Sequence, residues 1–363
     1  MPSISKSAKL FAGFAFSLFL LPALAFGQYQ RTDLVADAPN SDLVIKDTNL
    51  VNGWGLTRAD RSPAFPNGTP FWVSDNVTGK STLYTGAGQK LGLVVTIPPA
   101  AGGTKGSPTG VVFNITLNNQ TPSFSVSNGV KSGTAIFIFA TLDGTVSGWN
   151  PGVGGTNATI AVDRSSSGAV YTGLAITSDA SGDFLYATDN GPNSRIDVFD
   201  KNFTWMRSFT DPAIPSDLAP YGIQNINGNL WVTFGGNTKS RAGGTGFVDE
   251  FDAAGNVILR IGGNAPLHSP WGLAMAPANF GEFSNALLVA NNIPKGKIDA
   301  FDPSTGAFLG TLRDASGQVI IINQVWAIQF GNGGAAGNTN QLFFAAGPNN
   351  YANGLFGKIE VAP

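Results

Sequence analysis

The sequence contains no cysteine, one histidine and few charged residues, which make up 12% of its 363 positions. Without cysteine the chain can form no disulfide, thiol nucleophile, zinc ribbon or iron–sulfur cluster. A single histidine excludes metal sites that need several histidines, and a histidine-based triad would depend on His268 alone. The low charge content, beside 42% hydrophobic residues, excludes charge-driven disorder, coiled coils and helical bundles.

Glycine and proline are abundant instead, with 47 and 22 residues. Both residues favour turns, and no stretch after the N-terminal apolar segment keeps a helical period for three turns. The composition therefore predicts an all-β chain with many short connections. The formal net charge of −2 and the lack of basic clusters give no electrostatic reason to bind nucleic acid.

Residues 1–27 have the three parts of a secretory signal peptide. Lys6 and Lys9 precede an apolar run over residues 10–21, and small residues at cleavage spacing follow the run. The alternative is a membrane anchor, but the run is shorter than the roughly 20 residues that a spanning helix needs. We therefore expect cleavage after Gly27, a single domain over residues 28–363, and a monomer that is secreted or periplasmic without a membrane anchor.

Six segments repeat along the chain, and each begins with a short apolar strand built on a small residue. These small residues are Gly55, Gly110, Gly173, Gly222, Gly272 and Ala327. Their spacing suits a unit of four strands. A second strand rich in aromatic and β-branched residues follows in each unit. The third strand is the most regular, since residues 195–200, 247–252 and 297–302 alternate apolar and polar positions and close on Asp before a turn.

The sixth unit has no downstream sequence to supply its outermost strand, because only two residues follow Val361. Residues 31–36 form an orphan strand ahead of the first repeat. Pairing this strand with the last unit would close a ring and remove an exposed edge. We therefore predict a six-bladed β-propeller of four-stranded antiparallel blades, closed by the N-terminal strand. A β-sandwich or a β-helix array is the alternative.

Residues 49–56, 71–76 and 81–84 resemble an uncharacterised family of exported bacterial propeller proteins, some of which carry a Pro-Glu-Pro type sorting tail. The resemblance covers nearly the whole chain after the signal segment. It implies the propeller fold and export, and it brings no established activity. The sequence ends at Pro363 without the sorting tail. More loosely, the blades look like NHL-type and gluconolactonase-like propellers, and the second likeness would imply a hydrolase or lactonase.

Gluconolactonase-like propellers bind a divalent cation at the axis through Asn and Asp placed just before the glycine of two first strands, together with an acid. The matching residues here are Trp54, Thr109, Thr172, Tyr221, Trp271 and Trp326. None of them carries the carboxylate or amide oxygen that a hard cation prefers. We therefore expect no metal and no other cofactor.

The aromatic residues in these positions belong to blades four, five, six and one, which are contiguous once the ring closes. Two interpretations stay open. The arc of Tyr221, Trp271, Trp326 and Trp54 could bind a sugar ring or another flat ligand, because aromatic faces offer large apolar area. Alternatively, the same side chains fill the axial channel with their own bulk.

Asn and Asp residues gather in the loops that should form one face of the propeller, around the axis. They are Asn52, Asp75, Asn76, Asp189, Asn190, Asn291 and Asn292. Binding residues are common on loops held by a rigid scaffold. Asn and Asp also favour turns, because they tolerate left-handed backbone geometry and form local hydrogen bonds. A structural role in the turn is therefore the alternative to ligand binding at each position.

His268 lies between Pro266 and Pro270, on the loop that enters the fifth blade. It could act as a general base if Asp75 or Asp189 lay within hydrogen-bond reach, or it could be an exposed spacer. No Gly-x-Ser-x-Gly motif is present, and we assign no catalytic residue.

Three classes of function follow from these observations. The first is a non-enzymatic binding module whose face around the axis takes a carbohydrate, a flat small molecule or another exported protein. The others are a hydrolase or lactonase-like enzyme and a structural matrix protein. The predicted ligand-binding residues are the seven Asn and Asp residues above together with Trp54, Tyr221, His268, Trp271 and Trp326.

Overall fold

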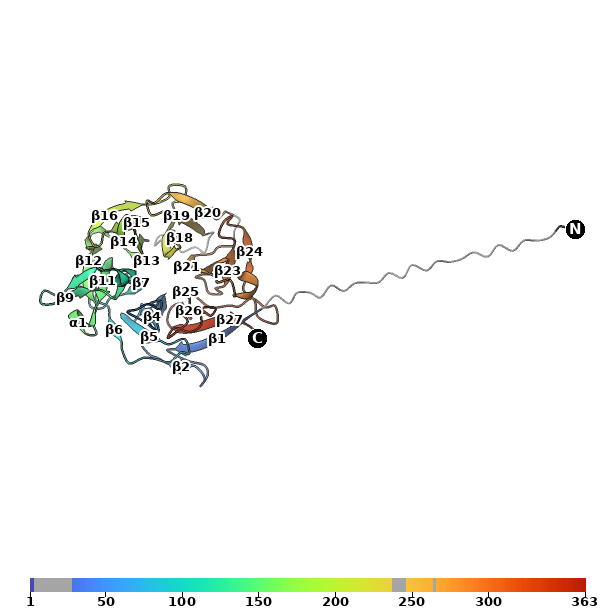
Figure 1. Ribbon diagram of the computed structural model, residues 1–363, viewed down its shortest axis with the longest axis horizontal. Helices are drawn as coiled ribbons and strands as arrows, with labels where there is room; N and C mark the ends of the chain where they lie inside the picture. The colour runs from blue at the N-terminus through green and yellow to red at the C-terminus, as the bar shows by residue number, and fades with distance from the viewer. Residues whose placement is uncertain (3–27, 237–245, 264–265) are drawn as a thin grey trace.

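Six antiparallel sheets are arranged in a ring around a central axis (Figure 1). The computed structural model describes residues 1–2, 28–236, 246–263 and 266–363. The predicted six-bladed β-propeller is confirmed, and each small residue of the repeat lies in the innermost strand of its blade. The apolar part of the signal segment and its cleavage site after Gly27 fall outside the described residues, as do parts of two loops on the predicted binding face.

The first three blades follow one another along the chain, each running from the axis to the rim. Blade 1 contains β3 (Gly53–Thr57), β4 (Phe71–Asp75), β5 (Lys80–Tyr84) and β6 (Val95–Thr96). Blade 2 contains β7 (Pro108–Phe113), β10 (Phe137–Thr141), β11 (Thr145–Trp149) and β12 (Thr159–Asp163). Blade 3 contains β13 (Tyr171–Asp179), β14 (Gly182–Asp189), β15 (Arg195–Phe199) and β16 (Trp205–Phe209).

The other three blades complete the ring. Blade 4 contains β17 (Leu218–Ile226), β18 (Asn229–Gly236), β19 (Phe247–Phe251) and β20 (Val257–Ile261). Blade 5 contains β21 (Pro270–Met275), β22 (Leu287–Asn291), β23 (Ile298–Phe301) and β24 (Phe308–Thr311). Blade 6 contains β25 (Val325–Phe330), β26 (Leu342–Ala346), β27 (Leu355–Val361) and, at its rim, β1 (Tyr29–Ala36) with β2 (Ile45–Lys46).

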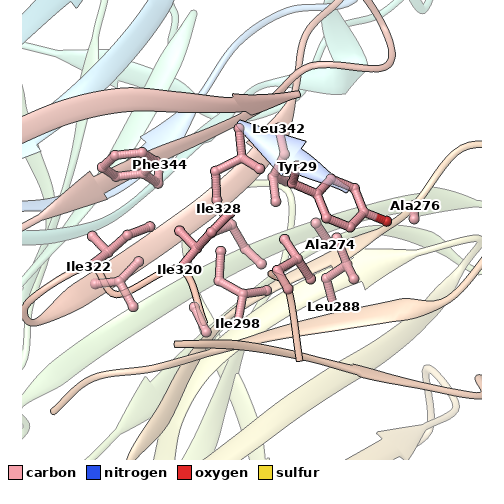
Figure 2. Packing of buried hydrophobic residues seen from close by; sticks show 14 of the residues in the cluster. Tyr29, Ala274, Ala276, Leu288, Ile298, Ile320, Ile322, Ile328, Leu342 and Phe344 are labelled. Atoms are coloured by element: carbon pink, nitrogen blue, oxygen red, sulfur yellow. The ribbon is translucent and has the colours of Figure 1, made fainter. Parts of the chain in front are cut away.

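The N-terminal strand β1 closes the ring, as predicted. It runs antiparallel to β27, with Arg31 opposite Ile359 and Ala36 opposite Leu355. Tyr29 anchors this strand between blades 5 and 6, where Figure 2 shows its ring beside Leu342. Its hydroxyl donates to the Phe280 carbonyl at 2.8 Å and accepts from the Phe283 amide at 3.0 Å. Burial raises the pKa of Tyr29 to about 12.

The small residues of the repeat are needed because the inner strands approach one another closely. A Cβ on Gly55 would collide with the Thr109 carbonyl of the next blade, and one on Gly222 would collide with the Trp271 carbonyl. Gly110 and Gly272 face their neighbouring blades in the same way. The repeated glycine therefore marks the positions where backbones of neighbouring blades touch near the axis.

Three features of the fold were not predicted. Strand β2 adds to β1 in parallel and makes the sixth sheet five-stranded. Blade 2 carries an extra hairpin of β8 (Ser125–Ser127) and β9 (Ser132–Thr134). The same blade has the short helix α1 (Pro151–Gly154), which begins where the Asn150 side chain accepts from the Gly152 amide.

Candidate functional site

Aromatic side chains of four blades meet at the axis and fill it. The indoles of Trp54 and Trp326 stack with ring centroids 3.6 Å apart at an interplanar angle of 15°. Trp271 meets them edge-on at 6.5 Å and 6.0 Å, and its Nε1 donates across the axis to the Thr172 carbonyl at 3.1 Å. The Tyr221 ring lies 5.8 Å from that of Trp326. The predicted arc is therefore a packed cluster, which we call the aromatic plug.

The two threonines that face the aromatic plug connect blades. Thr109 donates its hydroxyl to the Tyr171 carbonyl of blade 3 at 2.8 Å. Thr172 donates to the Tyr221 carbonyl of blade 4 at 2.7 Å. Both hydroxyls are thus used in bonds between blades.

A cavity of about 490 Å³ lies above the aromatic plug, on the face where binding loops were predicted. Its floor is formed by Trp54, Trp326 and Tyr221. The remaining described lining residues come from loops and strand ends: Asn52, Asn76, Val77, Leu142, Val170, Thr172, Asn190, Gly236, Ser269, Asn292, Ile293, Pro294 and Tyr351. We call this space the upper cavity.

No charged side chain is among these described lining residues. The wall offers amide, hydroxyl and carbonyl groups, and the floor offers aromatic carbon. A buried charge needs a partner that compensates its lost hydration. The described lining of the upper cavity supplies none, so its chemistry suits an uncharged ligand.

The amides of the wall are held in place by hydrogen bonds. Trp326 donates from Nε1 to Asn52 Oδ1 at 2.8 Å, and Asn52 Nδ2 lies 3.3 Å from Asn76 Oδ1. Asn76 Nδ2 in turn donates to the Pro108 carbonyl of blade 2 at 3.1 Å. This chain links the aromatic plug to the cavity wall and orients both amides.

The same amide bond recurs on alternate blades. Asn190 Nδ2 donates to the Pro220 carbonyl of blade 4, and Asn292 Nδ2 donates to the Val325 carbonyl of blade 6, both at 3.1 Å. The Tyr351 hydroxyl donates to Asn292 Oδ1 at 2.7 Å. The Oδ1 of Asn190 accepts no hydrogen bond from any described residue, and Asn190 lines the upper cavity. It is therefore an available acceptor for a ligand hydroxyl.

The residues that precede these asparagines do not line the cavity. Asp189 accepts hydrogen bonds from the amides of Val170 and Gly191, and Asn291 accepts from the His268 amide at 2.7 Å. Asn291 Nδ2 also donates to the Asp299 carboxylate at 2.8 Å. At these two positions the structure therefore shows turn and interstrand bonding.

Asp75 is fully buried, and within the described chain its two carboxylate oxygens have no hydrogen-bond partner. Burial raises its pKa well above the usual value. The nearby Asp47 is different, because its carboxylate accepts from the Tyr84 hydroxyl at 2.9 Å and from Lys90 Nζ at 2.8 Å. Asp75 is absent from the lining of the upper cavity.

His268 and Trp271 also lie outside the upper cavity. Among the described residues, the His268 side chain makes no hydrogen bond to Asp75 or Asp189, so the acid–base pair considered from sequence is not formed. Trp271 lies deeper, where it borders a void of about 20 Å³ beneath the plug. The structure therefore brings seven of the twelve predicted residues together: Asn52, Trp54, Asn76, Asn190, Tyr221, Asn292 and Trp326.

Tyr351 is the main lining residue that sequence reasoning did not name. Its ring lies 5.5 Å from that of Trp326, and its backbone has a positive φ of 67°. The residue pattern of the loop over residues 347–357 does not fix the direction of a tyrosine side chain. A tyrosine among Asn and Gly residues in that loop was the available signal.

Within the described ranges, no group of three or more His, Cys, Asp or Glu side chains could hold a metal ion. None of the helices there is long and apolar enough to cross a membrane.

No family model matches the sequence, and its curated relatives are uncharacterised proteins of Acanthamoeba polyphaga mimivirus. One is 29% identical over 329 residues, which cover 86% of this chain and 76% of that protein. A second is 35% identical over 234 residues, which cover 61% of this chain but only 42% of the relative. These relatives are viral, so they lend no support to the resemblance to exported bacterial proteins.

Solved structures with a similar fold include a COPII outer coat vertex, with a TM-score of 0.49 and 10% identity over 86% of this chain and 84% of that one. The WD40 β-propeller domain of Doa1 has a TM-score of 0.45 and 12% identity, over 85% and 93% of the two chains. A gluconolactonase from Xanthomonas campestris has a TM-score of 0.43 and 15% identity, over 86% and 97%. At these values the likenesses say nothing of what this chain binds.

Proposed function

We propose that this protein is an exported, non-enzymatic binding module that holds an uncharged carbohydrate or flat small molecule in the upper cavity. The observation that carries the proposal is the described lining, which combines an aromatic floor with oriented amides and lacks charge. A volume of about 490 Å³ is within the range of roughly 300–1,000 Å³ for small-molecule sites.

The floor and the wall have complementary tasks in this proposal. Tyr221 is half-buried whereas Trp54 and Trp326 are 6% and 2% exposed, so Tyr221 would supply most of the aromatic contact with a sugar ring or an aromatic ring. The Asn190 Oδ1 would accept a hydrogen bond from a ligand hydroxyl. Asn52, Asn76 and Asn292 are already fixed by their own bonds, so the site loses little entropy when a ligand binds.

The described lining also favours binding over catalysis. General acid–base chemistry depends on groups such as His, Asp, Glu or Lys placed beside the reacting atoms. The described residues of the upper cavity include none of these four, although Tyr221 and Tyr351, whose hydroxyls can also serve in such chemistry, do line it. A lactonase-like reaction therefore has no specific observation in its favour.

Export is part of the proposal and rests on the sequence of residues 1–27. A signal segment favours a secreted or periplasmic protein, and we keep the expectation that it is a monomer. N-terminal sequencing of the protein recovered from its producing cells tests export, and a first residue at or near Gln28 is the expected result. An intact N-terminus on the mature, active protein would contradict it, and analytical ultracentrifugation tests the monomer.

Tryptophan fluorescence tests binding directly, because two tryptophans form the cavity floor. Residues 28–363 are titrated with uncharged oligosaccharides and uncharged aromatic compounds. We expect a saturable change in emission with at least one of these classes. A flat response across a broad panel would overturn the proposal and leave the aromatic plug as a structural element alone.

A pair of variants assigns the signal to the upper cavity. Asn190→Leu removes the available acceptor, and we expect it to weaken binding about tenfold, the cost of one lost hydrogen bond. Asn225→Leu is the matched control. Asn225 also donates to a carbonyl of the neighbouring blade, that of Ile176 at 2.8 Å, but it lies at the opposite end of the axis. Equal weakening by both variants would contradict the assignment.

A further inference from the structure

A second cavity lies at the other end of the axis, where the inner strands end. Its volume is about 270 Å³, and we call it the lower cavity. The aromatic plug and the void of about 20 Å³ beneath it separate the two cavities. The described lining consists of Arg58, Asp60, Arg61, Ser62, Val112, Phe113, Ile115, Asn118, Ala175, Ile176, Gln224, Asn225 and Gln329.

The lower cavity carries positive charge, in contrast to the upper one. Arg58 is largely buried and donates to the Phe330 carbonyl at 2.9 Å and to Asp60 at 2.5 Å. Asp60 is 79% exposed and neutralises one of the two arginines. Arg61 is exposed, bonds the Pro66 carbonyl through Nε at 2.9 Å and the Gly333 carbonyl through Nη1 at 3.5 Å, and has no carboxylate partner within the described chain. One positive charge is therefore uncompensated at this site.

Two neutral amide side chains from inner strands also line the lower cavity. Gln224 of β17 and Gln329 of β25 both line the lower cavity and are partly buried. The Gln329 Oε1 is buried and has no partner among the described residues. The Nε2 atoms of Gln224 and Gln329 make no hydrogen bond with a described group, so both can donate to a ligand, whereas the Gln329 Oε1 can only accept. Buried polar groups are normally paired, and of these amide atoms only the Gln329 Oε1 is both buried and unpaired; the half-buried Gln224 is open to the cavity.

Another part of the lower cavity's lining is apolar. It is built by Val112 and Phe113 of β7, Ile115, and Ala175 and Ile176 of β13. The cavity thus has a cationic side from blades 1 and 6 and an apolar side from blades 2 and 3. A ligand that satisfies both sides has one anionic group and an apolar body.

We propose that the lower cavity is a second binding site, for a small organic monocarboxylate with an apolar body. Arg61 provides the charge, because a guanidinium binds a carboxylate through two parallel hydrogen bonds. Gln224 and Gln329 donate to the same group, and the apolar body lies against Ile176 and Val112. The proposal is independent of the upper cavity, since a different set of residues forms each site.

Isothermal titration of residues 28–363 at low ionic strength tests the proposal with three probes. Benzoate has both the carboxylate and an apolar ring, acetate has the charge alone, and benzyl alcohol has the ring alone. We expect benzoate to bind at least about tenfold more tightly than either of the others, because each lacks one contact of about 1.4 kcal/mol or more. No benzoate binding, or equal affinities for benzoate and benzyl alcohol, would overturn the proposal.

Two arginine variants separate a specific site from general surface charge. Arg61→Gln should weaken benzoate binding about tenfold, the effect of losing one charged hydrogen-bond partner. Arg207→Gln is the matched control, because Arg207 also bonds backbone carbonyls, those of Ala253 and Ala254, but lies on the rim of blade 3. If the two variants weaken binding equally, the site assignment fails.

Gln224→Leu provides a second test that leaves the net charge unchanged. We expect weaker benzoate binding with an unchanged thermal midpoint, since the Gln224 amide bonds no described group. Asn190→Leu should leave benzoate binding unchanged, because Asn190 lines the upper cavity. Benzoate binding that is lost in Asn190→Leu but kept in Gln224→Leu would place the carboxylate in the upper cavity and refute the proposal.

Discussion

The indole of Trp326 stacks on the indole of Trp54 at a centroid distance of 3.6 Å. Trp326 belongs to the last blade and Trp54 to the first, so this contact joins the two ends of the repeat array at the axis. Strands β1 and β27 join the same ends at the rim. The ring is therefore closed both at the axis and at the rim. The contact at the axis also forms part of the floor of the upper cavity.

Trp326→Ala should destabilise the protein strongly. Trp326 is 2% exposed, stacks on Trp54 and donates to Asn52. Truncating a buried aromatic residue typically costs about 3–5 kcal/mol, which chemical denaturation can measure. Trp205→Ala is the control, because Trp205 is 42% exposed at the rim, and it should cost far less. Similar losses in both variants would contradict a central role for the plug.

Tyr29→Phe tests closure at the rim. The change leaves the ring in place but removes the hydroxyl that bonds Phe280 and Phe283. Leaving these buried backbone groups unpaired should lower the free energy of unfolding by about 1–3 kcal/mol. Tyr186→Phe is the control, since the bond from the Tyr186 hydroxyl to the Ala253 carbonyl is long, at 3.4 Å. A smaller loss for Tyr29→Phe than for Tyr186→Phe would contradict the anchoring role.

Gly222→Ala tests the close approach of the inner strands. The new Cβ would collide with the Trp271 carbonyl of blade 5, and backbone cannot move aside as a flexible side chain can. We expect a loss of about 1–3 kcal/mol or a failure to fold. Gly92→Ala is the control, because nothing lies within 4 Å of a Cβ there. A stable Gly222→Ala protein would show that the repeated glycine is not needed for blade contact.

The blades could be predicted from the sequence because their determinants are local or repeated. Gly222 and its equivalents recur where backbones touch, and the third strands close on Asp residues such as Asp252, which binds the turn at Asn256. The match between residues 31–36 and the last blade followed from counting strands. These signals do not depend on how side chains pack.

The site could be predicted only in part, because side-chain direction depends on tertiary contacts. Asn190 and Asp189 are neighbours of similar polarity, yet one lines the upper cavity and the other binds turn amides. The Tyr351 hydroxyl bonds Asn292, a residue 59 positions away in the sequence, so its direction depends on a tertiary contact. The lower cavity was not predicted, since Arg61 and Gln224 meet there only after blades 1 and 4 enclose the axis.

Asp75 should make stability depend on pH. Because burial raises its pKa in the folded state above the unfolded value of about 3.9, the folded protein holds this proton more tightly. Its contribution to the free energy of unfolding therefore falls as pH rises above about 4 and continues to fall until the folded-state pKa is passed. Asp75→Asn removes this titration, so the variant should gain stability relative to wild type as pH rises.

Asp302→Asn gives the opposite sign and serves as the control. Hydrogen bonds from Ser304 and Thr305 lower the pKa of Asp302 to about 2, so its stabilising effect is present above about 4 and disappears as pH falls toward 2. This variant should therefore lose stability relative to wild type at neutral pH, with the difference closing in acid. Urea unfolding from pH 3 to pH 8 compares the two variants. A stability difference between Asp75→Asn and wild type that does not change with pH would show that the carboxylate does not titrate as a buried, unpaired group.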